Sequence, residues 1–256
     1  MILRRLKERL TAENWVAVAI ELLIVIVGVF IGTQVSNWNQ DRIAGRETRQ
    51  MLVELKPGLQ GFIDFFGTAR DYYRITGHYA GTAFAGWRGD PTVSDEQFVI
   101  AAYQASQIYT LGVNAVNWTR IFGGDRLDHV DDRALHNHLA NLMTLNFDQI
   151  DVPAISTPYR EHVRQQIPDD IQDAIRQKCG DKPIPDLPLT QRLSASCDLD
   201  FSAPHWAEAA RVLRQHPELA GELRWHRSAV ATFLSNMALF EQETGLVMAR
   251  LDQLGL

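Results

Sequence analysis

The stretch WVAVAIELLIVIVGVFIGTQV, residues 15–35, determines the architecture of this chain of 256 residues. Only Glu21 is charged in it, and as a helix it extends ~31 Å, close to the ~30 Å hydrocarbon core of a bilayer. Trp15 and Trp38 flank the apolar run, where interfacial aromatic residues gather. These features predict a transmembrane helix over residues 15–35.

Two other interpretations of this segment are a buried core helix and a cleavable signal peptide. A fully buried core helix can also be apolar on all sides, but Trp15 and Trp38 at the two ends of this segment favour a membrane span. The apolar region of a signal peptide usually spans about 7–15 residues and ends in small residues. This run is longer and ends in Gln34, Asn37 and Trp38, so we expect it to remain attached.

The basic residues near the helix predict its orientation in the membrane. Lysine and arginine favour the cytoplasmic side, and long C-terminal domains cross a membrane largely regardless of their own charge. The residues concerned are Arg4, Arg5, Lys7 and Arg9 before the helix, and Arg42, Arg46 and Arg49 after it. We therefore expect residues 1–14 to be cytoplasmic and residues 36–256 to form one extracytoplasmic domain.

One face of the predicted membrane helix differs chemically from the rest. Ala17, Glu21, Val25, Gly28 and Gly32 follow one another at steps of four, four, three and four residues. Gly28 and Gly32 allow close approach of a second helix, and Glu21 favours a polar partner over lipid. This predicts an interface through Glu21, Gly28 and Gly32 with another copy of the chain or another membrane protein. The alternative is a glycine-rich lipid face with Glu21 extending to the headgroups.

Composition and hydrophobic spacing predict an all-α domain after the anchor, arranged as an up-and-down helical bundle. Hydrophobic residues make up 46% of the chain, and the net charge of -6 argues against nucleic acid as a partner. The anchor helix should continue outward until Pro57 and Gly58 kink or interrupt it, and no strand is predicted. Further helices are expected at residues 59–87, 95–109, 114–122, 132–146, 158–166, 168–179, 204–216 and 218–254.

The two cysteines, Cys179 and Cys197, lie at the ends of a proline-rich stretch between residues 180 and 203. An oxidising compartment would permit a disulfide between them, and the bond would restrain an unusually long loop. Two free buried thiols are the alternative.

The polar segment DRLDHVDDRALHNH, residues 125–138, is the candidate for chemistry. His129, Asp132 and His136 would share a helix face at spacings that suit a metal. If Asp131 caps a helix, however, His129 falls outside it, and His136 and His138 point in different directions. We favour the cap, and no metal or cofactor is predicted. The usual short catalytic motifs do not occur in this sequence.

An aromatic run between residues 62 and 87, together with Trp118 and Trp225, is a second candidate, because pockets between helices often hold such residues. Arg70, Arg74 and His78 follow at four-residue steps and could meet an anion. Core packing and a solvated cationic face explain the same residues.

The segment AVAIELLIVIVGVFIGTQVSNWNQDR, residues 17–42, resembles the start of an uncharacterised family of bacterial inner-membrane proteins, known only as a domain of unknown function. Glu21, Asn37, Trp38 and Asn39 carry the likeness. Residues 118–143 look like that family's later motif, but Leu142 and Met143 replace its tyrosine pair. Gly124, Leu127, Asp131, Leu135 and Leu139 carry this second likeness. The resemblance implies a location in the inner membrane and no particular activity.

Together these observations predict a membrane-anchored module that binds a protein partner or small ligand in the periplasm without catalysis. An enzyme of unfamiliar type, with a His/Asp site at residues 129–138, is the alternative. Location is predicted more sharply than chemistry, because no residue pattern defines a reaction.

Overall fold

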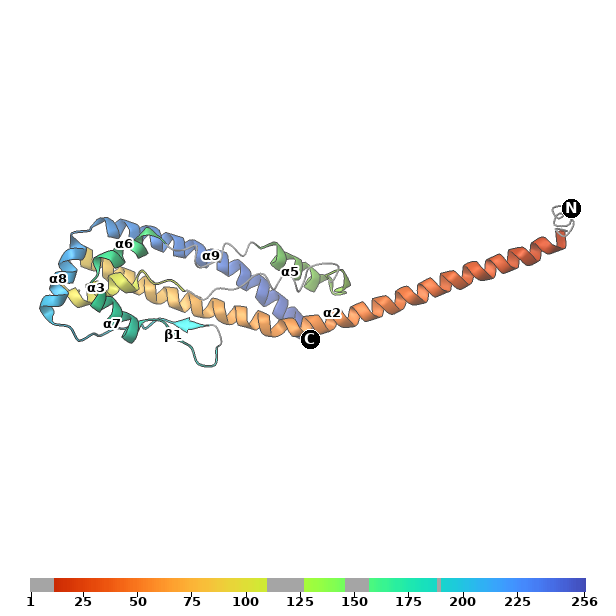
Figure 1. Ribbon diagram of the computed structural model, residues 1–256, viewed down its shortest axis with the longest axis horizontal. Coiled ribbons are helices and arrows are strands. Elements are labelled where there is room, and N and C mark those ends of the chain that lie inside the picture. Colours follow the sequence, from red (N-terminus) through yellow and green to blue (C-terminus); the bar gives the residue numbers. More distant parts are fainter. Residues whose placement is uncertain (1–11, 110–126, 146–156, 188–189) are drawn as a thin grey trace.

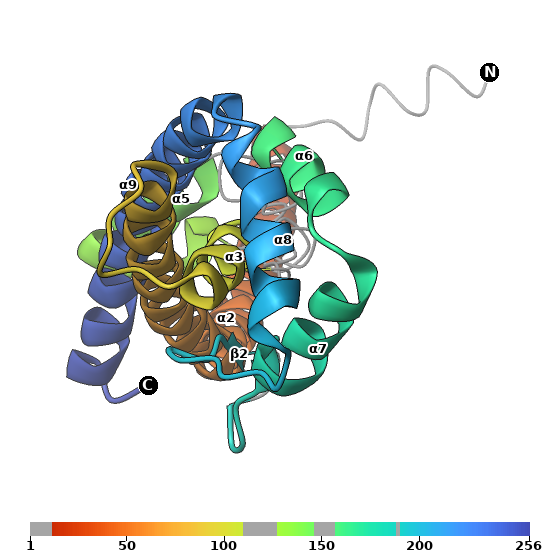
Figure 2. The same ribbon diagram turned by 90° about the vertical axis from the view of Figure 1, so that its left-hand side faces the viewer.

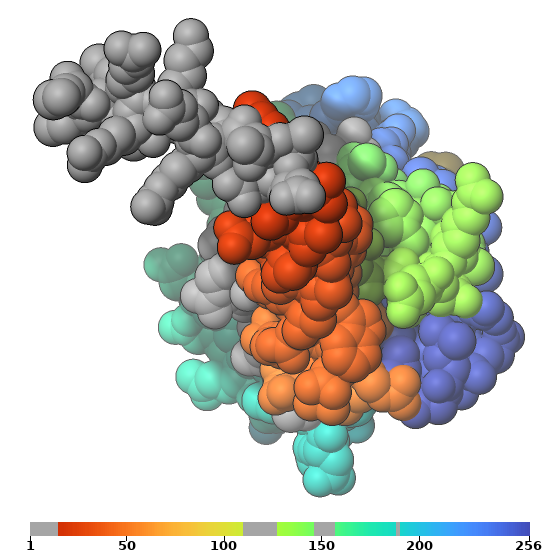
Figure 3. Space-filling model, turned by 90° about the vertical axis from the view of Figure 1, so that its right-hand side faces the viewer, coloured from red at the N-terminus to blue at the C-terminus, as the bar shows by residue number. Residues whose placement is uncertain are grey.

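The computed structural model describes residues 12–109, 127–145, 157–187 and 190–256 (Figure 1). Seven α-helices account for most of these residues, and the only strands among them contain two residues each. The predicted all-α class is therefore confirmed. The N-terminal helix projects from the bundle as a single rod (Figure 1), and Figure 3 views the molecule from the end at which this rod lies.

Helix α2 (Ala12–Trp87) contains 76 residues, so it extends ~114 Å at 1.5 Å per residue. Every described side chain from Trp15 to Val35 is exposed, and the first buried residue of the helix is Thr48. Residues 36–47, which we call the stalk, therefore hold the bundle ~18 Å from the apolar segment. Beyond the stalk, α2 becomes one of the two main helices of the bundle.

The prediction that Pro57 and Gly58 kink or interrupt this helix is wrong where it requires a break, because α2 continues through both residues. Proline removes the hydrogen bond to the carbonyl four residues earlier, here that of Val53. Val53 and Pro57 are both exposed, so water can satisfy that carbonyl. Leu55 and Leu59 are buried on the opposite face, and their packing holds the helix on both sides of the proline.

Helix α9 (Glu218–Gln253) runs antiparallel to α2 along the bundle (Figure 1). Near the stalk, the Lys56 ammonium contacts the Asp252 carboxylate and donates to the Leu256 carbonyl at 2.7 Å. Farther out, the rings of Tyr73 and Phe233 meet edge to face with centroids 5.6 Å apart. A continuous hydrophobic core lies between the two helices and under the shorter ones. Its central members include Leu59, Phe66, Ala69, Phe233, Met237, Phe240 and Val247.

The shorter helices cover the distal end and one flank of this pair (Figures 1 and 2). Helix α8 runs across the distal end in both views, next to α3 and α6, whereas α5 packs along α9 nearer the stalk. Among the described elements, only α2 and α9 run the full length of the bundle. The bounds are α3 Asp95–Gln104, η1 Leu127–His129, α5 Arg133–Thr144, α6 Pro158–Gln166, α7 Asp169–Cys179 and α8 Ala203–Arg214.

Local sequence signals set several of these boundaries. Ser94 and Gln97 form a capping box at the start of α3. The helix ends at Gln104 instead of residue 109, because the backbone of the next residues bonds to other elements. The Ser106 carbonyl accepts from Arg160, the Ile108 carbonyl accepts from Tyr72, and the Tyr109 amide donates to the Tyr73 hydroxyl.

Two further predictions need correction. Asp132, not Asp131, caps α5, and its carboxylate accepts from the Leu135 amide at 2.8 Å. The proline-rich stretch contains β1 (Lys182–Pro183) and β2 (Gln191–Arg192), which pair antiparallel. The helix predicted at residues 114–122 and the end of the one at 132–146 lie outside the described residues.

Candidate functional site

The predicted interface residues Glu21, Gly28 and Gly32 all lie on the exposed part of α2. A Cβ atom added at Gly28 or Gly32 would meet nothing within 4 Å. The stripe therefore faces away from the described part of the bundle and is free for contact with lipid or another helix.

The residues of the His/Asp segment lie in different structural settings. His129 is exposed in η1, while Asp132 caps α5 and pairs with Arg250 on α9 at 2.6 Å. The His138 Nδ1 atom lies 3.1 Å from a Glu243 carboxylate oxygen. Among the described residues, no group of three or more histidine, cysteine, aspartate or glutamate side chains is arranged to hold a metal ion. Asp132 and His138 thus join the α5 region to α9.

Arg70, Arg74 and His78, the predicted cationic row on α2, do not form a common anion site. Arg70 binds the Glu241 carboxylate with both contacts at 2.6 Å, Arg74 pairs with Asp71, and His78 is exposed. Most of the aromatic run is core, whereas Trp225 is 66% exposed and Trp118 lies outside the described residues.

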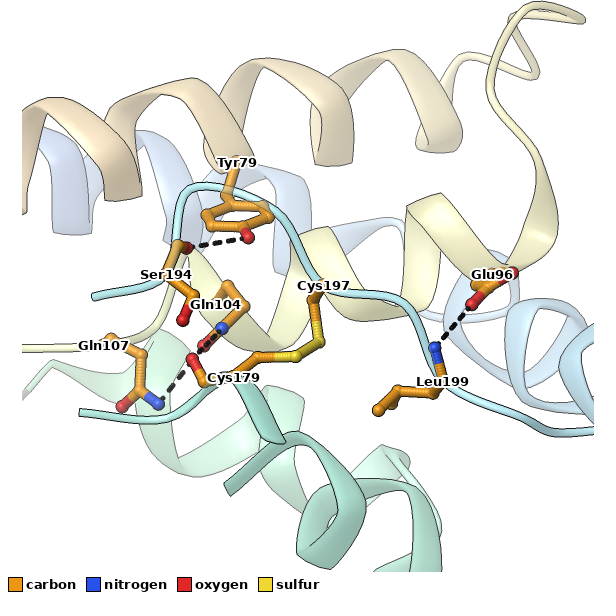
Figure 4. Close-up of a disulfide and its surroundings, with 8 residues drawn as sticks. All are labelled: Tyr79, Glu96, Gln104, Gln107, Cys179, Ser194, Cys197 and Leu199. Atoms are coloured by element: carbon orange, nitrogen blue, oxygen red, sulfur yellow. Dashed lines mark hydrogen bonds between the residues drawn. A yellow bond between two sulfur atoms is a disulfide. The ribbon is translucent and has the colours of Figure 1, made fainter. Parts of the chain in front are cut away.

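Cys179 and Cys197 form a disulfide in the structure, with Cα atoms 5.5 Å apart (Figure 4). It joins the end of α7 to the loop that leads to α8. Around it, the Tyr79 hydroxyl donates to the Ser194 carbonyl at 3.0 Å, and the Gln104 amide donates to the Cys179 carbonyl at 2.9 Å. The disulfide thus ties the loop to the end of α7, and these hydrogen bonds hold the loop against α2 and the end of α7 against α3.

A polar cluster that the sequence analysis did not identify lies where α6 meets the end of α3. Arg160 and Arg164, one helical turn apart on α6, are each half-buried. Arg160 Nη1 donates to the Ser106 carbonyl at 2.7 Å, and Arg164 donates to the Gln107 Oε1 atom at 2.9 Å. The Arg164 guanidinium also lies over the Tyr103 ring, 4.7 Å from its centroid. We call Arg160, Arg164, Tyr103, Ser106 and Gln107 the arginine cluster.

The two arginines of this cluster converge on the same neutral oxygen. Gln107 Oε1 accepts from Arg160 Nη1 at 3.3 Å and from Arg164 Nη2 at 2.9 Å. These two nitrogens are thus no more than ~6 Å apart, a separation at which unit charges repel by about 3 kcal/mol at an effective dielectric constant of ~20. Burial lowers the pKa of Arg164, and the charge of Arg160 lowers it further.

No carboxylate in the described part of the chain forms an ion pair with Arg160 or Arg164. Asp181 is an acid whose charge interacts with both arginines without a direct contact. Its Oδ1 atom accepts from the Tyr72 hydroxyl at 2.8 Å. Asp181 is exposed as a residue, yet the protein atoms around its carboxyl raise its pKa by desolvation, against the lowering effects of Tyr72 and the two arginines. The arginine cluster thus carries more positive charge than its contacts neutralise.

His226 on α9 is another polar group of the interior. It is 1% exposed, its Nδ1 atom lies 2.7 Å from the Thr157 hydroxyl, and its Nε2 atom has no partner among the described protein atoms. Burial, aided by the charge of Arg160, lowers its pKa to about 4, so the ring is neutral at neutral pH. His226, Tyr73, Thr76 and Arg227 help to line a cavity of about 140 Å³. A cavity of this size and polarity can hold a few water molecules.

The outer face of α9 is unusual for a helix surrounded by water. Its exposed positions between residues 228 and 249 carry no charged side chain. Glu241, Glu243 and Arg250 point instead toward partners on α2 and α5. Exposed residues follow one another every seven positions along this face, namely Trp225, Thr232, Leu239 and Leu246.

Comparison with family models, with curated proteins and with solved structures finds no match. The resemblance of residues 17–42 and 118–143 to a bacterial inner-membrane family therefore stays a prediction. The site has to be interpreted from its own geometry.

The arginine cluster could not be predicted in full from the sequence. The spacing of Arg160 and Arg164 on either side of the buried Val163 is visible in the sequence and indicates two cations beside a buried stripe. Their partners, Ser106 and Gln107, lie more than 50 positions earlier, and no local pattern connects the two segments.

Proposed function

We propose that this chain is a single-pass protein of a bacterial inner membrane whose helical bundle binds a partner or small ligand in the periplasm without catalysis. Residues 1–14 lie in the cytoplasm, residues 15–35 span the bilayer, and residues 36–256 lie on the other side. The observation that carries this proposal is the exposed apolar part of α2. Its most apolar window has a mean hydropathy of 2.7, and none of it is buried in the structure.

An exposed helix of this kind is explained by insertion into lipid. Soluble monomers rarely expose apolar patches larger than a few hundred Å², and a helix of ~31 Å that is apolar on all sides exceeds that size. Among the described residues it has no contact that would make it a core helix. The stalk that follows is polar and begins at the depth where the hydrocarbon core should end.

The topology can be tested with two reporters fused after Leu256. A reporter that folds only in the oxidising periplasm should be active, and one that is active only in the cytoplasm should not be. The basic residues before the helix support this expectation. The opposite pattern would reverse the proposed topology, and a chain that stays soluble after cell breakage would remove the anchor from the proposal.

A second copy of the chain is the partner that the surface favours. Two tethered copies stand side by side in one membrane, so identical helices meet in parallel around a twofold axis. Uncharged residues repeated every seven positions on α9 fit such pairing, because a heptad repeat brings like positions together along two parallel helices. The Glu21, Gly28, Gly32 stripe offers a second contact inside the bilayer.

Crosslinking of the full chain in its membrane tests this association. Gly28→Ile with Gly32→Ile should weaken it strongly, because the new side chains hold the neighbouring backbone away. Glu21→Ala should weaken it modestly, since polar contacts in membranes contribute about 0.6–2 kcal/mol. Val29→Ile, on another face of the helix, is the matched control. Equal crosslinking in all variants, or none in the parent, would contradict pairing through the anchor.

The α9 face is tested in the same assay with Leu239→Glu. A carboxylate at this exposed position should not disturb the core but should repel its counterpart in a paired helix. Ser228→Glu provides a milder change on the same face, and Arg224→Glu lies beyond its end. If Leu239→Glu leaves crosslinking unchanged while the anchor variants abolish it, the anchor alone holds the copies together.

A further inference from the structure

We propose that the arginine cluster binds a small oxyanion, the carboxylate or phosphate group of a soluble ligand, at Arg160 and Arg164. This deepens the ligand-binding part of the proposed function by naming a ligand class, and it does not depend on the topology of the chain. The first argument is the unbalanced charge. Two guanidinium groups share a neutral amide oxygen, and neither has an ion-pair partner among the described residues.

The second argument is the supply of hydrogen-bond donors. A guanidinium has five N–H groups, and the contacts with Ser106 and Gln107 engage Nη1 of Arg160 and Nε and Nη2 of Arg164. Arg160 Nε and Nη2 and Arg164 Nη1 have no partner among the described residues. None of these three atoms is among the buried, unpartnered atoms of the described residues, so they remain within reach of solvent. They are the donors that an oxyanion can engage.

The third argument is that the donors are held in place before a ligand arrives. The bond from Arg160 to the Ser106 carbonyl and the position of Arg164 over the Tyr103 ring fix both guanidinium planes. Both arginines lie on a helix, and their partners belong to the last turn of α3 and the buried segment that follows it. An oxyanion would therefore bind without ordering long side chains, which is the usual cost of binding by surface arginines.

The chemistry of the surroundings limits the ligand. Planar guanidinium groups match the oxygens of carboxylates and phosphates in paired hydrogen bonds. Asp181 lies near enough to influence both arginines and would repel a highly charged polyanion. The site thus suits a ligand that presents one oxyanion group, with the hydroxyl of Tyr103 and the amide of Gln107 as neutral neighbours.

Protection from an arginine-specific reagent tests the proposal on the unaltered full chain in detergent. Phenylglyoxal modification is followed peptide by peptide, with inorganic phosphate, succinate or sodium chloride added at equal ionic strength. At an anion concentration ten times the dissociation constant, Arg160 and Arg164 should react about tenfold more slowly. Arg224 and Arg227 on α9 are internal controls and should not be protected.

Each outcome of this experiment decides something. Protection by both anions supports a site that accepts phosphate and carboxylate groups alike. Protection by phosphate alone or by succinate alone shows which of these two groups the site binds. Equal protection of Arg224 and Arg227, or protection by chloride alone, would reduce the effect to general screening and overturn the site. Failure of Arg160 and Arg164 to react without any anion would also overturn it, because the proposal requires accessible donors.

A thermal measurement separates ligand binding from a structural role. Phosphate or succinate should raise the melting temperature of the parent and of Arg227→Gln but not of Arg160→Gln or Arg164→Gln. Arg164→Lys keeps the charge without the paired donors and should show a smaller rise. If the variants melt earlier but respond to the anions as the parent does, the arginines only join α6 to α3. Fractionation of the same proteins with the membrane tests the anchor separately.

Discussion

The contact between Gly86 on α2 and Phe98 on α3 yields a sharp test of the packing, the substitution Gly86→Ala. Gly86 is buried in the last turn of α2, directly under the ring of Phe98. A Cβ atom there would overlap ring carbons of Phe98, far inside the 3.0 Å that real Cβ atoms keep from their neighbours. Phe98 is fully buried, with Trp87 edge to face at 5.2 Å and the Arg214 guanidinium 5.2 Å from its ring. The ring therefore has little room to move away.

The magnitude follows from two opposing effects. Inserting a methyl group into a packed core costs about 1–3 kcal/mol, whereas alanine stabilises a helix over glycine by about 0.5–1 kcal/mol. We expect Gly86→Ala to lower the free energy of unfolding by about 1–2 kcal/mol. Gly81→Ala is the matched control, because Gly81 is exposed on the same helix with nothing within 4 Å of an added Cβ. It should raise that free energy by about 0.5–1 kcal/mol.

Thermal unfolding of the purified chain in detergent provides the assay. For a domain of this size, 1 kcal/mol shifts the melting temperature by about 2–4 °C, so the two variants should move in opposite directions. In a chain that already carries Phe98→Leu, Gly86→Ala should lower the free energy of unfolding by less than it does in the parent, because the smaller side chain leaves space for the methyl group. If Gly86→Ala is as stable as Gly81→Ala, the close packing of α3 on α2 is incorrect.

Two further predictions concern the disulfide and the cap of α5. Reduction of the Cys179–Cys197 bond, whose cysteines are 18 positions apart, should lower the free energy of unfolding by about 3 kcal/mol, measured by denaturant unfolding with and without reductant. Alkylation of both thiols in the unreduced protein would show that the bond does not form. The pKa of Asp132 is lowered from 3.8 to about 2, chiefly by its hydrogen bond with Arg250 and then by the Leu135 amide. Because the folded pKa is the lower one, this contribution to stability is complete above pH 3.8 and is lost as the pH falls through about 2. Asp132→Asn should flatten the pH dependence of the melting temperature in that window, and an unchanged profile would refute the assignment.

Much of the fold was predictable because its signals are local. The apolar run of residues 15–35, the capping box at Ser94 and Gln97, and the prolines in the first turns of α6 and α8 each act within a few residues. Helix starts were therefore located closely. Pro57 misled the prediction because its cost depends on which face of the helix it occupies, and burial of Leu55 and Leu59 is a tertiary property.

Helix ends and polar contacts were harder to predict for the same reason. Residues 105–109 have helical spacing but give up helical hydrogen bonds for contacts with α2 and α6. Thr157 occupies the N-cap position of α6, yet its hydroxyl bonds to His226 instead of capping the helix. Each of these choices depends on a residue between 36 and 69 positions away, so no window of local sequence contains the information.

The position of the arginine cluster along α2 restricts the source of the oxyanion. Tyr72, which shares Asp181 with the cluster, lies 37 residues beyond Val35 on one uninterrupted helix, a distance of ~55 Å at 1.5 Å per residue. Even a tilt of ~40° from the membrane normal would leave this point ~40 Å above the hydrocarbon core, whereas lipid headgroups extend only ~5–8 Å beyond it. Phosphates of the anchoring membrane therefore cannot reach Arg160 or Arg164 while the bundle stands on its stalk. Within the proposed topology, the oxyanion therefore belongs to a soluble ligand and not to a lipid of the anchoring membrane.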